Sequence, residues 1–144
     1  MKEGSRVIHY RDGEWESIVP RRYKTEGSHF RSITRRTLLG EGPGEAALGF
    51  LTRYFEILPG GYSSLERHRH PHAVLVLRGR GRVLLDGDTV ELVPFDCVYV
   101  APETPHQFQA ADDEPLGFLC IVDRERDRPR VISPEEAGNG AARG

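Results

Sequence analysis

Apolar residues along this chain fall in short runs, and turn-forming residues interrupt them about every 8 to 12 positions. The runs after residue 47 are rich in β-branched and aromatic residues, and they cover 48–58, 73–77, 82–85, 89–93, 97–100, 106–110 and 116–122. A helical period of 3.6 is absent apart from a short turn at 134–137. The pattern therefore predicts an all-β protein built as an antiparallel sandwich or barrel.

Glycine and proline mark the expected ends of these strands. Asp86-Gly87-Asp88 is a strong hairpin signal, and Gly79-Arg80-Gly81 is read as a second hairpin turn. The run 48–58 is expected to end at Pro59-Gly60-Gly61. Consecutive strands joined by such short turns should lie side by side in the sheet.

The first third of the chain has a different character. It is polar, and it contains two short β-like pieces at 6–10 and 30–34 before a loop at 41–44. We therefore divide the chain into an N-terminal β arm (1–45), a barrel (46–133) and a flexible Gly- and Ala-rich tail (134–144). The apolar residues of the arm need burial, so the arm is expected to contact a second copy and form a homodimer.

Composition narrows the class of protein. The 144 residues suffice for one hydrophobic core, and 38% hydrophobic with 29% charged residues is ordinary for a soluble globular domain. A formal net charge of −2 gives no reason to expect a nucleic-acid or membrane partner. Two cysteines without a CxxC pair, and no signal-like or membrane-spanning apolar segment, lead us to expect a reduced, cytoplasmic protein.

A cluster of imidazoles and a carboxylate stands out against this background. Glu66, His68 and His70 occupy alternate positions, His72 follows Pro71, and His106 comes later in the chain. In an extended strand, residues two apart point to the same side, so the first three could face one interior. Imidazole and carboxylate are the ligands that divalent first-row metals take in proteins. The cluster predicts a metal site.

The spacing around this cluster resembles the first motif of the cupin family. Gly60 is followed by five residues, then by Glu66-Arg67-His68, by three more residues and His72, and by six more and Gly79. Two ligand identities depart from the family pattern, because a glutamate stands in a histidine position and His72 in a glutamate position. Cupins are small jelly-roll β-barrels whose metal ligands point into the barrel.

The second cupin motif is degenerate in this chain. His106 stands in its histidine position and follows Pro105, as the family pattern has it. The departures from the pattern are Phe95, Ala101, Glu103 and Ala110. The resemblance covers about residues 48–122 and implies an antiparallel jelly-roll barrel of the small, single-domain, metal-binding kind.

Two ligand sets are compatible with the sequence. The first keeps the family spacing and uses Glu66, His68, His72 and His106. The second uses His68 and His70 as the paired histidines, with His106 and a contribution from His72. A one-residue loop at Pro71 is too short to join two barrel strands, which favours the first set. His70 then lies in the turn, as an alternative ligand or as a supporting group outside the metal's own ligands.

The expected cofactor is one divalent transition metal: iron, manganese, copper or nickel, with zinc also able to bind. Parity along the strands places Phe108, Val74 and Val76 toward the site, which favours an apolar or aromatic ligand. Cys120 is read as a buried structural thiol, and the alternative implied by the family-like Phe118-Leu119-Cys120 is that it approaches the metal.

The resemblance leads us to expect an enzyme, a mononuclear non-haem oxygenase acting on a small apolar or aromatic molecule. Two alternatives stay open. One is a binding or sensing cupin without turnover. The other is a metal-dependent isomerase, which would need basic pocket residues such as Arg53 or Arg82.

Overall fold

The computed structural model describes residues 4–24 and 29–137. Strands make up nearly all of its regular structure. In chain order they are β1 (Tyr10–Arg11), β2 (Glu14–Trp15), β3 (Arg21–Arg22), β4 (Arg31–Leu39), β5 (Phe50–Tyr62), β6 (Glu66–Arg67), β7 (His72–Gly79), β8 (Gly81–Leu85), β9 (Asp88–Leu92), β10 (Cys97–Val100), β11 (His106–Ala110), β12 (Leu116–Asp123) and β13 (Arg130–Val131). Within the described residues, no helix has the length and apolarity needed to cross a bilayer.

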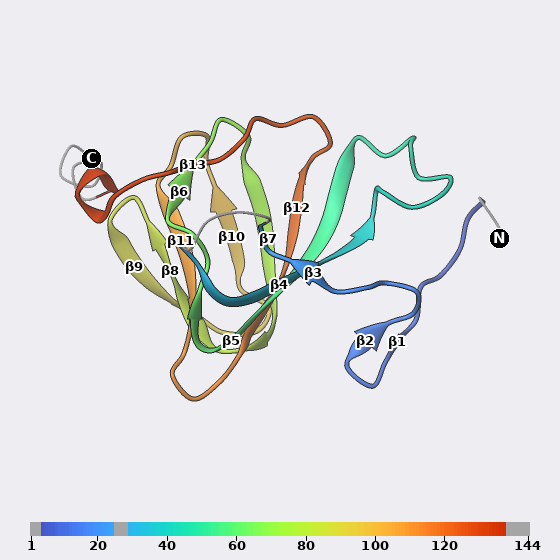
Figure 1. Ribbon diagram of the computed structural model, residues 1–144, viewed down its shortest axis with the longest axis horizontal. Helices are drawn as coiled ribbons and strands as arrows, with labels where there is room; N and C mark the ends of the chain where they lie inside the picture. The colour runs from blue at the N-terminus through green and yellow to red at the C-terminus, as the bar shows by residue number, and fades with distance from the viewer. Residues whose placement is uncertain (1–3, 25–28, 138–144) are drawn as a thin grey trace.

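The main sheet is antiparallel and curls around one core (Figure 1). Its strands follow the order β10-β7-β12-β5-β11-β6-β13, while β4 with β3 joins β5, and β8 with β9 joins β11. The short hairpin of β1 and β2 stands to one side of the barrel. The predicted all-β jelly-roll architecture is confirmed.

One predicted hairpin is present and one is not. Asp86 and Gly87 form a two-residue turn with positive φ at both positions, and β8 and β9 pair directly across it. The turn at 79–81 joins strands that do not pair, because β7 lies between β10 and β12 while β8 lies beside β11. Gly79 has a φ of 75°, and a side chain there would collide with the carbonyl of Pro115. The chain therefore crosses between sheet layers at this glycine.

Part of the predicted N-terminal arm, strands β3 and β4, belongs to the main sheet. Strand β4 pairs with β5 of the same chain from Arg31 to Leu39, with irregular register near Ser32, which has a φ of 54°. Strand β5 runs on to Tyr62, past the predicted end at residues 59–61. The apolar residues of this part of the arm thus find burial within the chain. The homodimer stays a prediction.

The C-terminal region begins with one helical turn at 134–137. Ser133 caps it: its hydroxyl accepts a hydrogen bond from the Glu136 amide, and its own amide donates to the Glu136 carboxylate. Residues 138–144 of the predicted tail lie outside the described residues.

The core fills the space between the sheet layers. Ile57, Val76, Val100 and Leu116 are fully buried there. Nearer one end, the phenyl ring of Phe118 stacks on Phe55, with centroids 5.5 Å apart, and on Phe108, at 4.5 Å. These rings form the floor on which the candidate site is built, and burying aromatic rings of this size contributes strongly to stability.

Candidate functional site

Three histidines meet above this aromatic floor. His68 follows the end of β6, while His72 and His106 are the first residues of β7 and β11. One ring nitrogen from each lies within 4.8 Å of the others. Of the residues that the sequence analysis proposed as ligands, these three are brought together. Strand pairing brings His106 close to the other two, because β11 pairs with β6. His72 lies near His68 because β7 starts directly after the His68 loop.

The backbone around His68 differs from the extended strand expected for 66–70. Strand β6 ends at Arg67, and residues 68–71 form a loop. The polar groups of this loop have partners other than a sheet: the His68 carbonyl accepts from the Glu103 amide at 2.7 Å, and the amides of Arg69 and His70 donate to Asp127. A buried loop of this kind is stable only when such partners exist.

Each of the three imidazoles is held through its Nδ1 atom. Nδ1 of His68 lies 2.6 Å from the His70 carbonyl oxygen, and Nδ1 of His106 lies 2.8 Å from that of Thr104. Nδ1 of His72 lies 3.0 Å from a thiol sulfur. The Nε2 atoms of His68 and His72 are buried without a hydrogen-bond partner among the described residues. Rings fixed at Nδ1 with Nε2 unpartnered are typical of histidines that bind a metal.

The electrostatics of the site favour neutral imidazoles. Burial, together with repulsion from His106, lowers the pKa of His68 to about 4. Burial also lowers the pKa of His106 to about 4, and it places the pKa of His72 far below the ordinary value. The neutral ring is the form that coordinates a metal, so no proton needs to be displaced near neutral pH.

These shifts predict that acid destabilises the metal-free protein. In the unfolded chain the histidine pKa returns to about 6.5, so the unfolded chain binds more protons than the folded one between pH 6.5 and 4. Stability is then full above pH 6.5 and falls as the pH is lowered through this window. We expect the free energy of unfolding, measured with denaturant and a chelator, to be at least about 2 kcal/mol lower at pH 5 than at pH 7.5, which is what a single histidine with this shift contributes. An equal or higher value at pH 5 would contradict these buried, neutral rings.

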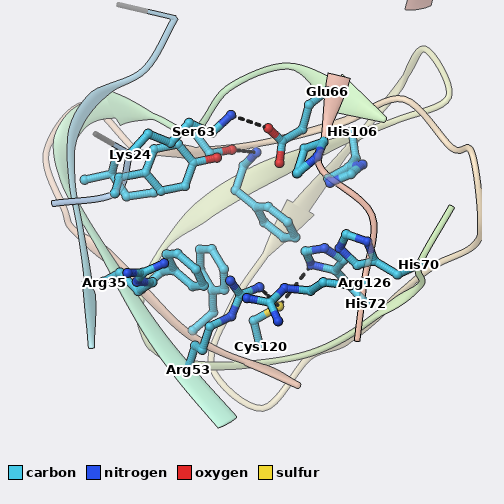
Figure 2. A pocket seen from close by; sticks show the side chains of 16 residues that line it. Lys24, Arg35, Arg53, Ser63, Glu66, His70, His72, His106, Cys120 and Arg126 are labelled. Atoms are coloured by element: carbon cyan, nitrogen blue, oxygen red, sulfur yellow. Dashed lines mark hydrogen bonds and ion pairs between the residues drawn. The ribbon is translucent and has the colours of Figure 1, made fainter. Parts of the chain in front are cut away.

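Glu66 does not join the histidine group. Its side chain is buried, and its Oε2 accepts a hydrogen bond from Lys24 Nζ at 2.7 Å. Glu66 is opposite His106 in the β6–β11 pairing, and Figure 2 shows the two side chains next to each other. The sequence analysis did not foresee the ion pair, because Lys24 lies 42 residues away in the chain.

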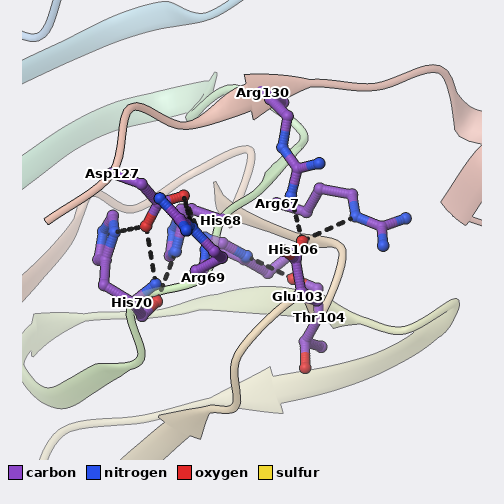
Figure 3. A network of polar contacts seen from close by, with 9 residues as sticks. All are labelled: Arg67, His68, Arg69, His70, Glu103, Thr104, His106, Asp127 and Arg130. Carbon is purple, nitrogen blue, oxygen red and sulfur yellow. Dashed lines mark hydrogen bonds and ion pairs between the residues drawn. The ribbon is translucent and has the colours of Figure 1, made fainter.

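His70 supports the site from outside the histidine group (Figure 3). Its ring stacks on His68 with centroids 3.8 Å apart, and its Nδ1 lies 2.9 Å from the Asp127 carboxylate. Asp127 also accepts hydrogen bonds from the amides of Arg69 and His70, at 2.8 and 2.9 Å. Bonds from these amides and from His70 hold the pKa of Asp127 well below its usual range, so the carboxylate is ionised. Asp127 thus clamps the loop that presents His68.

We predict that Asp127→Asn weakens metal binding without abolishing it. The amide keeps one acceptor oxygen but loses the charge that holds the loop and the His70 ring. Partners outside the metal's own ligands are worth about 10 to 100-fold in affinity, and a fall of about 10-fold is expected here. Competition with a fluorescent chelator measures it. Asp113→Asn is the control, since this exposed carboxylate pairs only with Arg80. Equal affinities in the two variants would contradict the clamp.

A cavity of about 220 Å³ adjoins the histidines. Phe108 lines it as predicted, with Phe55 and Phe118, whereas Val74 and Val76 lie in the core instead. The cavity wall also carries four cationic side chains: Lys24, Arg35, Arg53 and Arg126. Of the two arginines named for the isomerase alternative, Arg53 lines the cavity and Arg82 does not. An apolar wall with this many cations suits an amphiphilic anion better than a hydrocarbon.

Cys120 is buried, as expected, and it also lines this cavity. It is 1% exposed, its Sγ lies 3.0 Å from His72 Nδ1, and Arg53 Nη2 lies 3.9 Å away on another side. Burial raises the pKa of the thiol, and the Arg53 charge opposes that shift. A buried thiol thus lies in contact with the histidine group (Figure 2).

Comparison with known proteins gives a consistent result. The Cupin_2 family model, described as the cupin domain, matches residues 53–122. A 1-methylthio-D-xylulose 5-phosphate methylsulfurylase from Rhodospirillum rubrum is 45% identical over 124 residues, covering 85% of this chain and 76% of that protein. A cupin-2 domain structure from R. rubrum has a TM-score of 0.78 at 35% identity, covering 98% of this chain and 95% of its own. One from Halorhodospira halophila has a TM-score of 0.70 at 46% identity, covering 98% and 92%. The chain belongs to the cupin family.

Proposed function

We propose that this protein is a metal-dependent methylsulfurylase, which removes a methylthio group from a small phosphorylated ketose. One observation carries the proposal: a three-histidine group, a buried thiol and several cations share one cavity. The 45% identity with the R. rubrum methylsulfurylase supports the choice of reaction, and the cations suit a phosphorylated molecule.

The proposed metal ligands are His68, His72 and His106. The unpartnered Nε2 atoms of His68 and His72, and the neutral ring of His106, fit a divalent ion, which when bound would supply a Lewis acid that polarises a ketone. Iron, manganese, nickel, copper and zinc all accept such nitrogen donors. Glu66 is the proposed fourth ligand, and it would have to turn from Lys24 to reach the ion.

The protein's own groups would prepare the thiol. If Nε2 of His72 were to hold the ion, the ring proton would lie on Nδ1, which is 3.0 Å from Cys120 Sγ. That N–H would donate a hydrogen bond to the sulfur and stabilise the thiolate, assisted by the positive charge of Arg53.

The proposed transfer balances as follows. The Cys120 thiolate attacks the methylthio sulfur, the bond between that sulfur and ketose carbon 1 breaks, and its electron pair stays on carbon 1, delocalised into the neighbouring carbonyl. The proton given up by the thiol ends on carbon 1, which yields a 1-deoxy ketose and a methyl disulfide on Cys120. A low-molecular-weight thiol then exchanges with this disulfide and restores Cys120.

The assay is direct. Metal-reconstituted protein is incubated with 1-methylthio-D-xylulose 5-phosphate and a small thiol, and the methylthio protons are followed by NMR. We expect the substrate signal to be replaced by those of a methyl disulfide and a 1-deoxy ketose phosphate. Unchanged substrate with every metal tested would overturn the proposal.

The oxygenase predicted from the sequence stays a second candidate, because aromatic rings line the cavity and three nitrogen ligands leave open coordination positions. Oxygen consumption by the iron- or copper-loaded protein with an aromatic substrate would favour it. The methylsulfurylase reaction proceeds equally under anaerobic conditions, since its balance contains no dioxygen.

A further inference from the structure

We infer that Arg35, Arg53 and Arg126 form a binding site for the phosphate group of a phosphate monoester. The inference rests on the proposed function and locates the charged end of its substrate. Lys24, the remaining cation of the cavity, is not part of the site, because it lies apart from Arg53 and Arg126, on the side of Ser63 and Glu66 (Figure 2).

The three guanidinium groups come from separate parts of the chain and line the same cavity. Arg35 lies on β4, Arg53 on β5, and Arg126 in the segment that follows β12. Figure 2 shows Arg53 and Arg126 next to Cys120, with Arg35 farther along the wall and away from His106. A ligand held by these groups would reach toward both the thiol and the histidines.

No carboxylate neutralises these arginines in the part of the chain that the structure describes. Other arginines of the protein do form ion pairs, for example Arg36 with Glu14 and Arg78 with Glu56. Arg53 is 8% exposed, and its Nε has no hydrogen-bond partner among the described residues; the same holds for the buried Nε of Arg35. An unpaired buried guanidinium is costly, so a bound anion would satisfy these groups.

The arginines also disfavour one another. Partial burial lowers the pKa of Arg35 and of Arg126, the charge of Arg53 lowers both further, and the carboxylate of Glu41 opposes these shifts. Glu41 does not line the cavity, and three like charges around one cavity indicate a site prepared for a multiply charged anion. A guanidinium group can donate two parallel hydrogen bonds to two phosphate oxygens. A phosphate dianion also offsets more of the repulsion between the arginines than a single carboxylate can.

Inorganic phosphate, titrated calorimetrically into metal-free protein, tests the site without any contribution from a bound metal. We expect saturable binding to the wild type that weakens at least 10-fold in Arg53→Met and in Arg35→Met. Arg82→Met is the matched control, because this half-buried arginine bonds Gln109 outside the cavity and should leave binding unchanged. Circular dichroism verifies folding, and Arg35→Met, on a half-buried side chain, keeps the test open if Arg53→Met does not fold.

Absence of phosphate binding in the wild type, or equal binding in the wild type and both cavity variants, would overturn the inference. Failure of the proposed function looks different. Arginine-dependent phosphate binding without methylsulfuryl transfer would retain the site and reject the reaction. Transfer that proceeds with the same KM in both cavity variants would retain the reaction and reject the site.

Discussion

Replacing His106 by alanine removes the bound metal: we expect about one equivalent of a divalent transition metal in the reconstituted wild type and an affinity more than 100-fold lower in His106→Ala. His106 is one of three donors whose nitrogens lie within 4.8 Å of one another, and two histidines cannot hold the ion as three do. This loss of metal affinity should exceed the roughly 10 to 100-fold that residues hydrogen-bonded to the ligands contribute. Elemental analysis after dialysis against a weak chelator measures it.

His29→Ala is the matched control, because His29 is exposed and is not part of the histidine group. It should retain the metal fully. Glu66→Ala in parallel tests the fourth ligand: a clear loss of metal would assign the carboxylate to the ion, and full retention would limit the site to the three histidines. Full metal occupancy in His106→Ala would contradict the site as described.

Replacing Cys120 by serine should abolish methylsulfuryl transfer while the metal stays bound. A serine hydroxyl can still bond Nδ1 of His72, so the ring keeps its orientation. A hydroxyl is nevertheless a far weaker nucleophile toward sulfur than a thiolate, and we expect kcat/KM to fall at least about 100-fold. The NMR assay and elemental analysis on the same preparation separate the two effects.

Cys97→Ser provides the comparison, because Cys97 is the exposed thiol of the chain and lies outside the cavity. Its activity should equal that of the wild type. Transfer by Cys120→Ser at the wild-type rate would show that the attacking sulfur comes from the external thiol alone.

Much of the fold follows from local sequence patterns, since an alternating or apolar run predicts a strand wherever it is buried. The hairpin predicted at Asp86-Gly87 is confirmed, because positive φ at both residues is the conformation of a two-residue hairpin turn. The segment Gly79-Arg80-Gly81 is also read as a hairpin turn, yet it joins two strands that do not pair with each other. Which strands pair depends on long-range packing, and a local turn motif does not encode it.

The candidate site divides in the same way. The spacing of His68, His72 and the later His106 points to the metal group, because two of its members are close in the chain. Asp127 and Arg126 come from the segment after β12 and carry no motif of their own. From sequence alone, an arginine on a strand is expected to lie on the solvated surface unless the cavity that it borders is known. For this reason the sequence did not predict that several cations line one cavity.

The most direct test of the account is the intact mass of the metal-loaded protein after reaction with 1-methylthio-D-xylulose 5-phosphate in the absence of added thiol. We predict one methylsulfanyl group per chain, located by peptide mapping on Cys120, and its release when a thiol is added. Turnover with no modification of Cys120, or modification of the exposed Cys97 alone, would contradict the account.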